Sequence, residues 1–269
     1  MDELKPEAFF DLQSCDCRDL FSGCDYVWQA LGRISAYLEK NPTGNVAGVG
    51  TFCEPLPRTT VLWKGEVLRE GFKLLGGDVT KGTFRVKIDG EETTEAVVLF
   101  AGAVLWDDRI RLGPGTVVEP GALIKGPAII GSRTEIRQGA YLRGKCIVGN
   151  RCVVGHTTEM KSSIMLDGAK AGHFAYIGDS ILGGGSNLGA GTKLANLKII
   201  GDNIKIRMGS ENIDTGLRKF GAILGDGVEI GCNAVTNPGT LLGKKAMVFP
   251  VTSVPGGYHK PNSLLRPGR

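Results

Sequence analysis

The sequence predicts a mainly β protein, in which a parallel β-helix follows a smaller N-terminal portion with one helix and several short strands. All three Trp and 12 of the 18 aromatic residues precede residue 109, whereas 29 of the 41 Gly follow it. After that point aliphatic residues recur every six positions. A period of six is neither helical nor a simple strand alternation, so it predicts coils with short flat faces and tight corners.

The period of six defines the expected core of the β-helix. Its aliphatic positions are Leu112, Val118, Ile124, Ile130, Ile136, Leu142, Val148, Val154 and Met160, then Leu182, Leu188 and Leu194, then Leu224, Ile230, Thr236, Leu242 and Val248. Four residues after each of the first nine stands a mostly small residue: Thr116, Ala122, Ala128, Thr134, Ala140, Cys146, Cys152, Thr158 and Ile164. We expect one aliphatic and one small residue to point inward on each face of a coil.

The N-terminal portion shows other patterns. Residues 26–38 carry apolar side chains at helical spacing, so we expect a helix with Asp25 as its N-cap that ends before Asn41. Alternating apolar residues predict strands near 61–63, 83–88 and 96–100, with a hairpin turn at Asp89-Gly90. We therefore expect three parts: residues 1–108 as a helical and β-rich portion, 109–255 as the β-helix domain, and 256–269 as a C-terminal tail.

Composition limits the classes of function. The longest apolar run, residues 96–106, falls short of the ~20 residues needed to cross a bilayer, and the acidic start of the chain does not fit a secretory signal. We expect a cytoplasmic protein without a membrane partner. The net charge is +4, but no basic run interleaved with aromatic residues predicts nucleic-acid binding.

The seven cysteines are an odd number, which favours free thiols over a disulfide framework. Cys15 and Cys17, with Cys24 nearby, are the clustered ones. A structural zinc site needs a fourth ligand, and no His is near in sequence, so we expect small buried side chains and no metal.

A parallel β-helix with this repeat occurs in acyltransferases, in γ-class carbonic anhydrases and in scaffolds without activity, so the fold alone does not predict a function. A carbonic anhydrase needs three zinc-binding imidazoles, two of them close in sequence. This chain has only His156, His173 and His259, spaced 17 and 86 residues apart. That spacing argues against the zinc enzyme.

The register of six slips between Met160 and Ser180, and such slips commonly mark a site. This segment reads Glu-Met-Lys at 159–161, Lys-Ala-Gly-His at 170–173, Tyr-Ile-Gly-Asp at 176–179 and Asn-Leu-Gly-Ala-Gly-Thr at 187–192, with a further Asn at 196. It resembles the acetyltransferase domain of the bifunctional enzymes that acetylate glucosamine 1-phosphate and then uridylate it. The end of the match, with its longer insertion before residue 218, is more similar to the archaeal sugar-1-phosphate nucleotidylyltransferase/acetyltransferases.

The resemblance covers residues 112–254, a little over half of the chain. It implies a left-handed parallel β-helix, a hand that the spacing itself does not define. The family's N-terminal nucleotidyltransferase domain has no counterpart in the first 108 residues, so nucleotidyl transfer and its magnesium are not carried over.

The same resemblance implies roles for single residues. His173 matches the family's general base, and an imidazole titrates in the range needed to take a proton from an ammonium group. Cations at two family positions hold the sugar phosphate, and three polar residues contact or orient the sugar. These matches are Arg143 and Lys161 for the phosphate, and Tyr176, Asn187 and Asn196 for the sugar. Ala190 and Lys219 match contacts to the acyl-CoA.

We therefore expect an enzyme, a hexapeptide-repeat acyltransferase that transfers an acetyl group from acetyl-CoA to the amine of a glucosamine-1-phosphate-like sugar. Related enzymes bind acyl-CoA between subunits, so the resemblance implies a homotrimer, and a flat apolar β-helix face would suit association. The alternative is a non-catalytic scaffold that binds a sugar phosphate or sugar nucleotide. The first 108 residues, and Cys232 where the family has a Ser, keep that alternative open.

Overall fold

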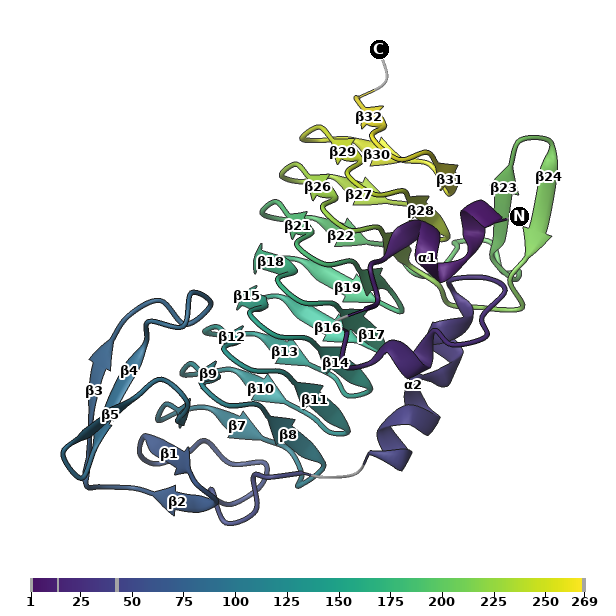
Figure 1. Ribbon diagram of the computed structural model, residues 1–269. Helices are drawn as coiled ribbons and strands as arrows, with labels where there is room; N and C mark the ends of the chain where they lie inside the picture. Colours follow the sequence, from purple (N-terminus) through teal and green to yellow (C-terminus); the bar gives the residue numbers. More distant parts are fainter. Residues whose placement is uncertain (1, 14, 42–43, 268–269) are drawn as a thin grey trace.

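The computed structural model of the protein describes residues 2–13, 15–41 and 44–267. Its dominant feature is a solenoid of parallel strands stacked in three sheets, which makes the molecule elongated (Figure 1). The predicted parallel β-helix is therefore confirmed. An antiparallel β-hairpin region lies at the N-terminal end of the solenoid, and short helices lie along one side of it (Figure 1).

Sheet 1 has eleven strands, of which the last nine are the parallel ones of the solenoid. In spatial order they are β2 (Glu66–Leu68), β1 (Thr60–Trp63), β6 (Val97–Leu99), β9 (Val117–Val118), β12 (Glu135–Ile136), β15 (Val153–His156), β18 (Lys170–His173), β21 (Asn187–Leu188), β26 (Glu229–Ile230), β29 (Met247–Val248) and β32 (Leu264–Leu265).

Sheets 2 and 3 have eight parallel strands each. Sheet 2 contains β7 (Val104–Leu105), β10 (Leu123–Ile124), β13 (Tyr141–Leu142), β16 (Glu159–Lys161), β19 (Tyr176–Gly178), β22 (Lys193–Leu194), β27 (Val235–Thr236) and β30 (Ser253–Val254). Sheet 3 contains β8 (Ile110–Leu112), β11 (Ala128–Ile130), β14 (Cys146–Val148), β17 (Ser163–Met165), β20 (Ile181–Leu182), β25 (Ala222–Leu224), β28 (Thr240–Leu242) and β31 (Gly257–His259).

The predicted inward column is present. All seventeen positions assigned from the period of six are buried, none more than 4% exposed. The small residues between them close the corners: the Thr116 hydroxyl, for example, donates to the Gly131 carbonyl in the next coil at 2.6 Å. Burial raises the pKa of both Cys146 and Cys152 to about 12, which fits thiols that serve as small core side chains. Of the nine mostly small residues that were expected to point inward, Ile164 does not, because its side chain lies on the outer face of sheet 3.

The outer face of sheet 3 is apolar and is covered by the chain itself. The central residues of its strands pair coil to coil and form one stripe: Ile129, Ile147, Ile164, Ile181, Ile223, Leu241 and Tyr258. The covering elements are η1 (Asp2–Leu4), α1 (Pro6–Phe9), η2 (Arg18–Leu20) and α2 (Gln29–Lys40). Leu4, Phe9, Trp28 and Ile34 of this N-terminal arm share one buried cluster with the stripe. Most of this face is therefore covered by the chain itself.

The helix α2 confirms the prediction for residues 26–38 but begins three residues later. Asp25 is not its N-cap: that position is held by Trp28, which makes no side-chain capping bond. The Gln29 side chain instead accepts hydrogen bonds from the backbone N–H groups of Asp25 and Tyr26 at 2.9 and 3.2 Å. No helix within the described ranges has the length and apolar character needed to cross a membrane.

The β-hairpin region caps the first coil. β1 pairs antiparallel with β6, and β6 pairs in parallel with β9, so the solenoid begins near Val97 and not at the expected boundary of residue 109. A separate three-stranded sheet of β3 (Phe72–Gly76), β4 (Arg85–Ile88) and β5 (Glu91–Thr93) packs on this edge. The turn between β4 and β5 is the predicted Asp89-Gly90 hairpin.

A long insertion separates two neighbouring strands of sheet 3. Ile181 in β20 pairs with Ile223 in β25, 42 residues later. Residues 195–221 form this insertion, which contains the hairpin of β23 (Lys205–Met208) and β24 (Glu211–Asp214). Ile204 and Phe220 anchor the insertion in the same buried cluster as the N-terminal arm.

The covered face gives a stability prediction. Ile34→Ala in α2 removes a side chain that is 2% exposed, and we expect it to lower the free energy of unfolding by about 2–5 kcal/mol, as is usual for such a change in a core. Ile199→Ala is the matched control, because Ile199 is fully exposed and should change stability by less than about 0.5 kcal/mol. Denaturant unfolding measures both; equal effects would show that the arm does not pack on sheet 3.

Candidate active site

The slip in register lies at two corners between sheets 2 and 3. Partner residues in neighbouring coils differ by 18 from the pair Ile110–Ala128 through the pair Tyr141–Glu159, but by 17 from the pair Cys146–Ser163 through the pair Tyr176–Lys193. The inward residues Met160 and Met165 are five apart instead of six, and so are Ile177 and Leu182. Each of these corners is therefore one residue short, and the two corners carry Lys161 and Asp179.

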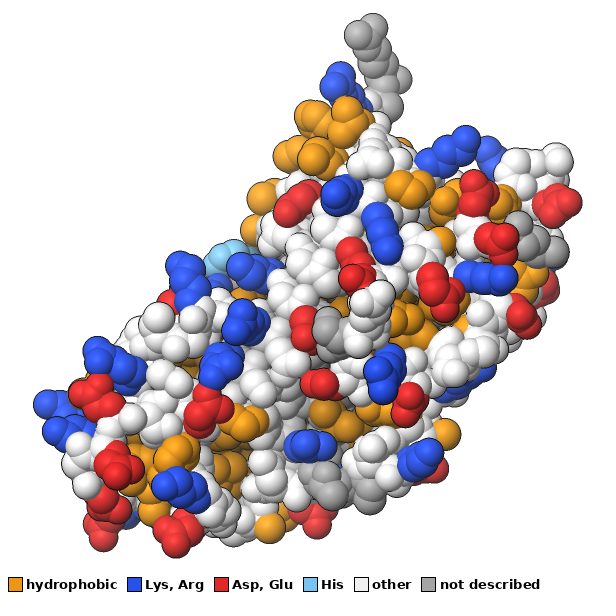
Figure 2. All heavy atoms as spheres, viewed as in Figure 1, with side chains coloured by type: hydrophobic (Ala, Val, Ile, Leu, Met, Phe, Trp, Pro, Cys, Tyr) orange, Lys and Arg blue, Asp and Glu red, His pale blue; other side chains and the backbone are white. Residues whose placement is uncertain are grey.

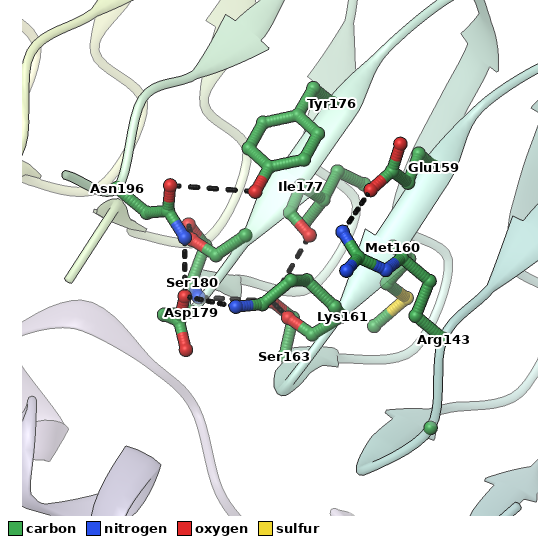
Figure 3. A network of polar contacts seen from close by, with 12 residues as sticks. Arg143, Glu159, Met160, Lys161, Ser163, Tyr176, Ile177, Asp179, Ser180 and Asn196 are labelled. Carbon is green, nitrogen blue, oxygen red and sulfur yellow. Dashed lines mark hydrogen bonds and ion pairs between the residues drawn. The ribbon is translucent and has the colours of Figure 1, made fainter. Parts of the chain in front are cut away.

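Lys161 and Asp179 form an ion pair across the two short corners, with Nζ and Oδ2 3.1 Å apart (Figure 3). Their side chains are only 17% and 16% exposed, so this pair is partly removed from water. The Asn196 amide donates to the same Asp179 oxygen. Asp179 has a positive φ of 46°, a backbone conformation that Asp tolerates better than most residues. The carboxylate thus holds both the ammonium and the amide in place.

Tyr176 lies next to Lys161, Asp179 and Asn196 (Figure 3). Its hydroxyl donates to Asn196 Oδ1 at 3.4 Å, and burial raises the pKa of the phenol (Figure 3). A Cβ at Gly178 would lie 2.6 Å from the Tyr176 hydroxyl and 2.7 Å from Asn196 Nδ2. Gly178 therefore makes the space in which the tyrosine and the amide meet.

Arg143 completes the group on the neighbouring coil. Its guanidinium donates to Glu159 Oε1 at 2.6 Å, and this bond raises the pKa of the guanidinium (Figure 3). Both side chains are more exposed than Lys161 and Asp179. An arginine has five N–H donors and a lysine three, so both cations keep donors for a ligand while they stay paired with carboxylates.

His173 lies at the corner between sheets 1 and 2, on the other side of sheet 2 from the corners that carry Lys161 and Asp179. It ends β18, and the exposed Phe174, with a φ of 52°, turns the corner toward Tyr176. His156 is its partner in the preceding coil. Both imidazoles contact the Phe174 ring, with ring centroids 6.3 Å apart for His173 and 5.1 Å apart for His156. The His173 side chain has no hydrogen bond to any other described residue, whereas His156 Nδ1 lies 3.0 Å from the Gln138 carbonyl.

The other predicted residues lie around this core. The Asn187 amide, on β21, donates to Glu229 at 3.0 Å, and the Ala190 carbonyl accepts from the Asn233 N–H at 2.8 Å. Lys219 is exposed on the insertion, next to Phe220, whose N–H donates to the Asn196 carbonyl at 2.9 Å. The structure thus brings Arg143, Lys161, Tyr176 and Asn196 together on sheet 2, and leaves His173, Asn187 and Ala190 toward sheet 1.

The sequence reasoning missed the two carboxylates. Glu159 and Asp179 stand in the quoted motifs, but only the stacked coils show that they face Arg143 and Lys161. His156 was also missed as a neighbour of His173. Its 17-residue spacing was visible, and it equals one coil in the shortened part of the solenoid.

No group of three or more His, Cys, Asp or Glu side chains is gathered for a metal ion anywhere in the described ranges. All seven cysteines are free. The Cys15 and Cys17 sulfurs lie 3.3 Å apart, and hydrogen bonding with Cys17 lowers the pKa of Cys15.

A cavity of about 380 Å³ lies elsewhere, between the end of α2 and the first coils of sheet 3. Leu38, Arg111 and Ile129 are among its lining residues, and none of the predicted site residues lines it. Its walls are mainly apolar, and it lacks the polar group described above.

Comparison with known proteins supports the resemblance. Residues 124–247 match the GMPPB C-terminal domain family. A bifunctional sugar-1-phosphate nucleotidylyltransferase/acetyltransferase of Sulfurisphaera tokodaii is 36% identical over 97 residues, which is 36% of this chain and 24% of the relative. The bifunctional protein GlmU of Pseudomonas entomophila is 30% identical over 183 residues, 62% of this chain and 36% of the relative. The chain thus spans about a quarter to a third of the curated relatives it matches.

Among solved structures, a UDP-N-acetylglucosamine acyltransferase from Campylobacter jejuni matches with a TM-score of 0.35 and 18% identity, over 62% of this chain and 70% of that one. The sequence relatives confirm the similarity to nucleotidylyltransferase/acetyltransferases that the motifs of residues 159–196 predicted.

Gly178 gives a test of the packing in this group. We expect Gly178→Ala to push the Tyr176 hydroxyl and the Asn196 amide apart and to lower the free energy of unfolding by about 1–3 kcal/mol, the usual cost of overpacking. Gly172→Ala is the control, because a Cβ there would meet no atom within 4 Å. Denaturant unfolding of both variants, with a crystal structure of the first, checks this; an unmoved Tyr176 would contradict it.

Proposed function

We propose that this protein is an acetyl-CoA-dependent N-acetyltransferase that acts on an amino-sugar phosphate of the glucosamine 1-phosphate kind. The observation that carries the proposal is the group at the two short corners: Arg143 and Lys161 with free donors, and Tyr176 and Asn196 beside them. Two adjacent cations suit a phosphate dianion, and a phenol and an amide suit sugar hydroxyls. The similarity to enzymes whose names include acetyltransferase supports the same reaction.

In the proposed reaction the sugar amine attacks the carbonyl carbon of the acetyl thioester. The C–S bond breaks, coenzyme A leaves as a thiolate that is then protonated, and the proton of the amine goes to His173. A base is needed because an amino sugar is largely protonated near neutral pH and only the free amine attacks. His173 suits this role because its imidazole is exposed and not committed to another described side chain. Asn187, Ala190 and Lys219 would then contact the sugar and the acyl donor.

The proposed base predicts a kinetic effect. His173→Ala should lower turnover by about 10²- to 10⁴-fold, the usual contribution of general-base catalysis, and leave acetyl-CoA affinity nearly unchanged. The assay is acetylation of a panel of amino-sugar phosphates, with His259→Ala as the control because His259 lies in a distant coil.

Two results would contradict this part of the proposal. A His173→Ala protein that acetylates at the wild-type rate would exclude His173 as the base. If only His156→Ala lost activity, the role of base would belong to His156. A folded wild-type protein that acetylates no amino-sugar phosphate would favour the non-catalytic scaffold.

We also propose that the protein is a homotrimer. An exposed apolar patch covers the last coils where sheets 1 and 2 meet, and Figure 2 shows hydrophobic side chains at this end of the molecule. The patch consists of Val235, Met247, Phe249, Val251 and Leu264, which are 36–71% exposed. Such a patch on a soluble domain is typical of an interface. Because sheet 3 is covered by the N-terminal arm, this patch is an apolar surface on which the solenoid could contact other copies.

Assembly can be tested by light scattering at micromolar concentration, where we expect the mass of a trimer. Met247→Lys combined with Val251→Lys should shift the protein to monomers, because a buried unpaired charge is costly. Ile199→Lys is the control, since Ile199 is exposed on the insertion, away from the patch. A wild-type monomer would rule out a site shared between subunits.

A further inference from the structure

A row of cationic and aromatic side chains extends from the candidate site toward the first coils of sheet 2. Trp106, Lys125, Arg143 and Lys161 occupy the same position in four successive coils. The backbone N–H groups of Trp106, Lys125 and Arg143 each donate a hydrogen bond to a carbonyl of the next coil. The acceptors are Ile124, Leu142 and Met160, at 2.8, 2.9 and 2.8 Å. Neighbouring members are thus one strand spacing apart, about 4.8 Å. Figure 2 shows several Lys and Arg side chains on this face.

The three cations of the row differ in their partners. Arg143 is paired with Glu159, and Lys161 with Asp179. Lys125 has no ion pair with any residue in the described part of the chain; its Nζ lies 3.9 Å from the centroid of the Trp106 ring and 5.6 Å from that of Tyr141. The row therefore carries one cation more than it carries carboxylates.

Trp106 ends the row with an indole that is 43% exposed. The large hydrophobic side chains of sheet 3 are buried by the N-terminal arm, whereas this one is left in solvent beside a lysine. An exposed cation–π contact is weak, so the Lys125 ammonium can leave the ring for a phosphate oxygen without much loss. The indole then presents a flat surface on which a nucleobase can stack.

We propose that this row is a nucleotide subsite, and that the amino-sugar phosphate bound at the candidate site is the sugar end of a nucleoside diphosphate sugar. Lys161 and Arg143 hold the phosphate next to the sugar, Lys125 holds the second phosphate one coil further, and Trp106 stacks on the base. The inference rests on the proposed function, because it extends the same site.

The order of the groups along the row supports this ligand. A sugar nucleotide is a linear chain of sugar, two phosphates, ribose and base. Along sheet 2 the sugar-contacting Tyr176 is followed by Lys161, Arg143, Lys125 and Trp106, coil by coil. A monophosphate dianion would be satisfied by Arg143 and Lys161 and would leave Lys125 and the indole without a role. Stacking on one ring does not select a base, so the class of ligand is defined and the base is not.

The test measures binding alone, by calorimetric titration of the full chain. The probes are UDP-glucosamine, glucosamine 1-phosphate, UDP and coenzyme A. We expect UDP-glucosamine to bind at least 10-fold more tightly than glucosamine 1-phosphate. Trp106→Ala and Lys125→Gln should each reduce this preference by about 10-fold, the usual effect of losing a stacked ring or a charged hydrogen bond.

The chain offers a matched control. Lys64 lies over the ring of Trp63, with its Nζ 5.0 Å from the centroid, in the β-hairpin region and outside the row. Trp63→Ala and Lys64→Gln remove a similar lysine–indole pair and should leave the preference unchanged. Thermal unfolding of all four variants verifies that each is folded.

Several outcomes would overturn the subsite. It is wrong if UDP-glucosamine and glucosamine 1-phosphate bind equally, if the Trp63 variant loses the preference as well, or if Trp106→Ala weakens coenzyme A instead, which would assign the row to the acyl donor. Failure of the proposed acetyl transfer is distinguishable: UDP-glucosamine would still bind with the expected preference, but no acetylated product would form. UDP binding that is weaker in both row variants supports the subsite independently of the sugar.

Discussion

The constraint on which the rest of this structure depends is the shared inward column. Every coil must place its aliphatic residues at 0–4% exposure in one continuous core and pair its backbone with the coils on either side. Strand positions therefore have little freedom, because a shift by one residue would turn an inward side chain outward. Corners are not held in this way. Variation in length and chemistry gathers there, and both short corners of the candidate site are of this kind.

The outer faces of sheets 2 and 3 differ in their side chains and in what covers them. Sheet 3 carries an apolar stripe that the N-terminal arm and the insertion bury, so this face adds a second core. Sheet 2 carries charged and aromatic residues that no described element covers to the same degree. Because the arm occupies the outer face of sheet 3, the candidate site and the exposed apolar patch both lie on sheets 1 and 2 and their corners.

Carboxylates give the candidate site its order before any ligand is present. Asp179 holds Lys161 and Asn196, and Glu159 holds Arg143. Surface ion pairs contribute little to stability, about 0–1 kcal/mol, so their value here is in fixing the direction of long, flexible side chains. The partly buried pair of Lys161 and Asp179 fixes the centre of the group, and the more exposed pair of Arg143 and Glu159 leaves its rim adaptable.

The sequence by itself determined the solenoid, because its core is a local repeat: the aliphatic at each sixth position needs no knowledge of distant residues, and all seventeen assigned positions are buried. It also indicated where the candidate site lies, since the slip after Met160 is visible as a missing residue in that count, and the structure shows the short corners there. The predicted N-cap of α2 was wrong, because the Gln29 side chain accepts the backbone N–H groups of Asp25 and Tyr26. The solenoid begins earlier than expected, because β6 already pairs in parallel with β9. Only the tertiary structure decided which side chains meet. Glu159 and Arg143, or Lys161 and Asp179, are 16 and 18 residues apart along the chain, and they come together because stacking places one coil about 4.8 Å from the next.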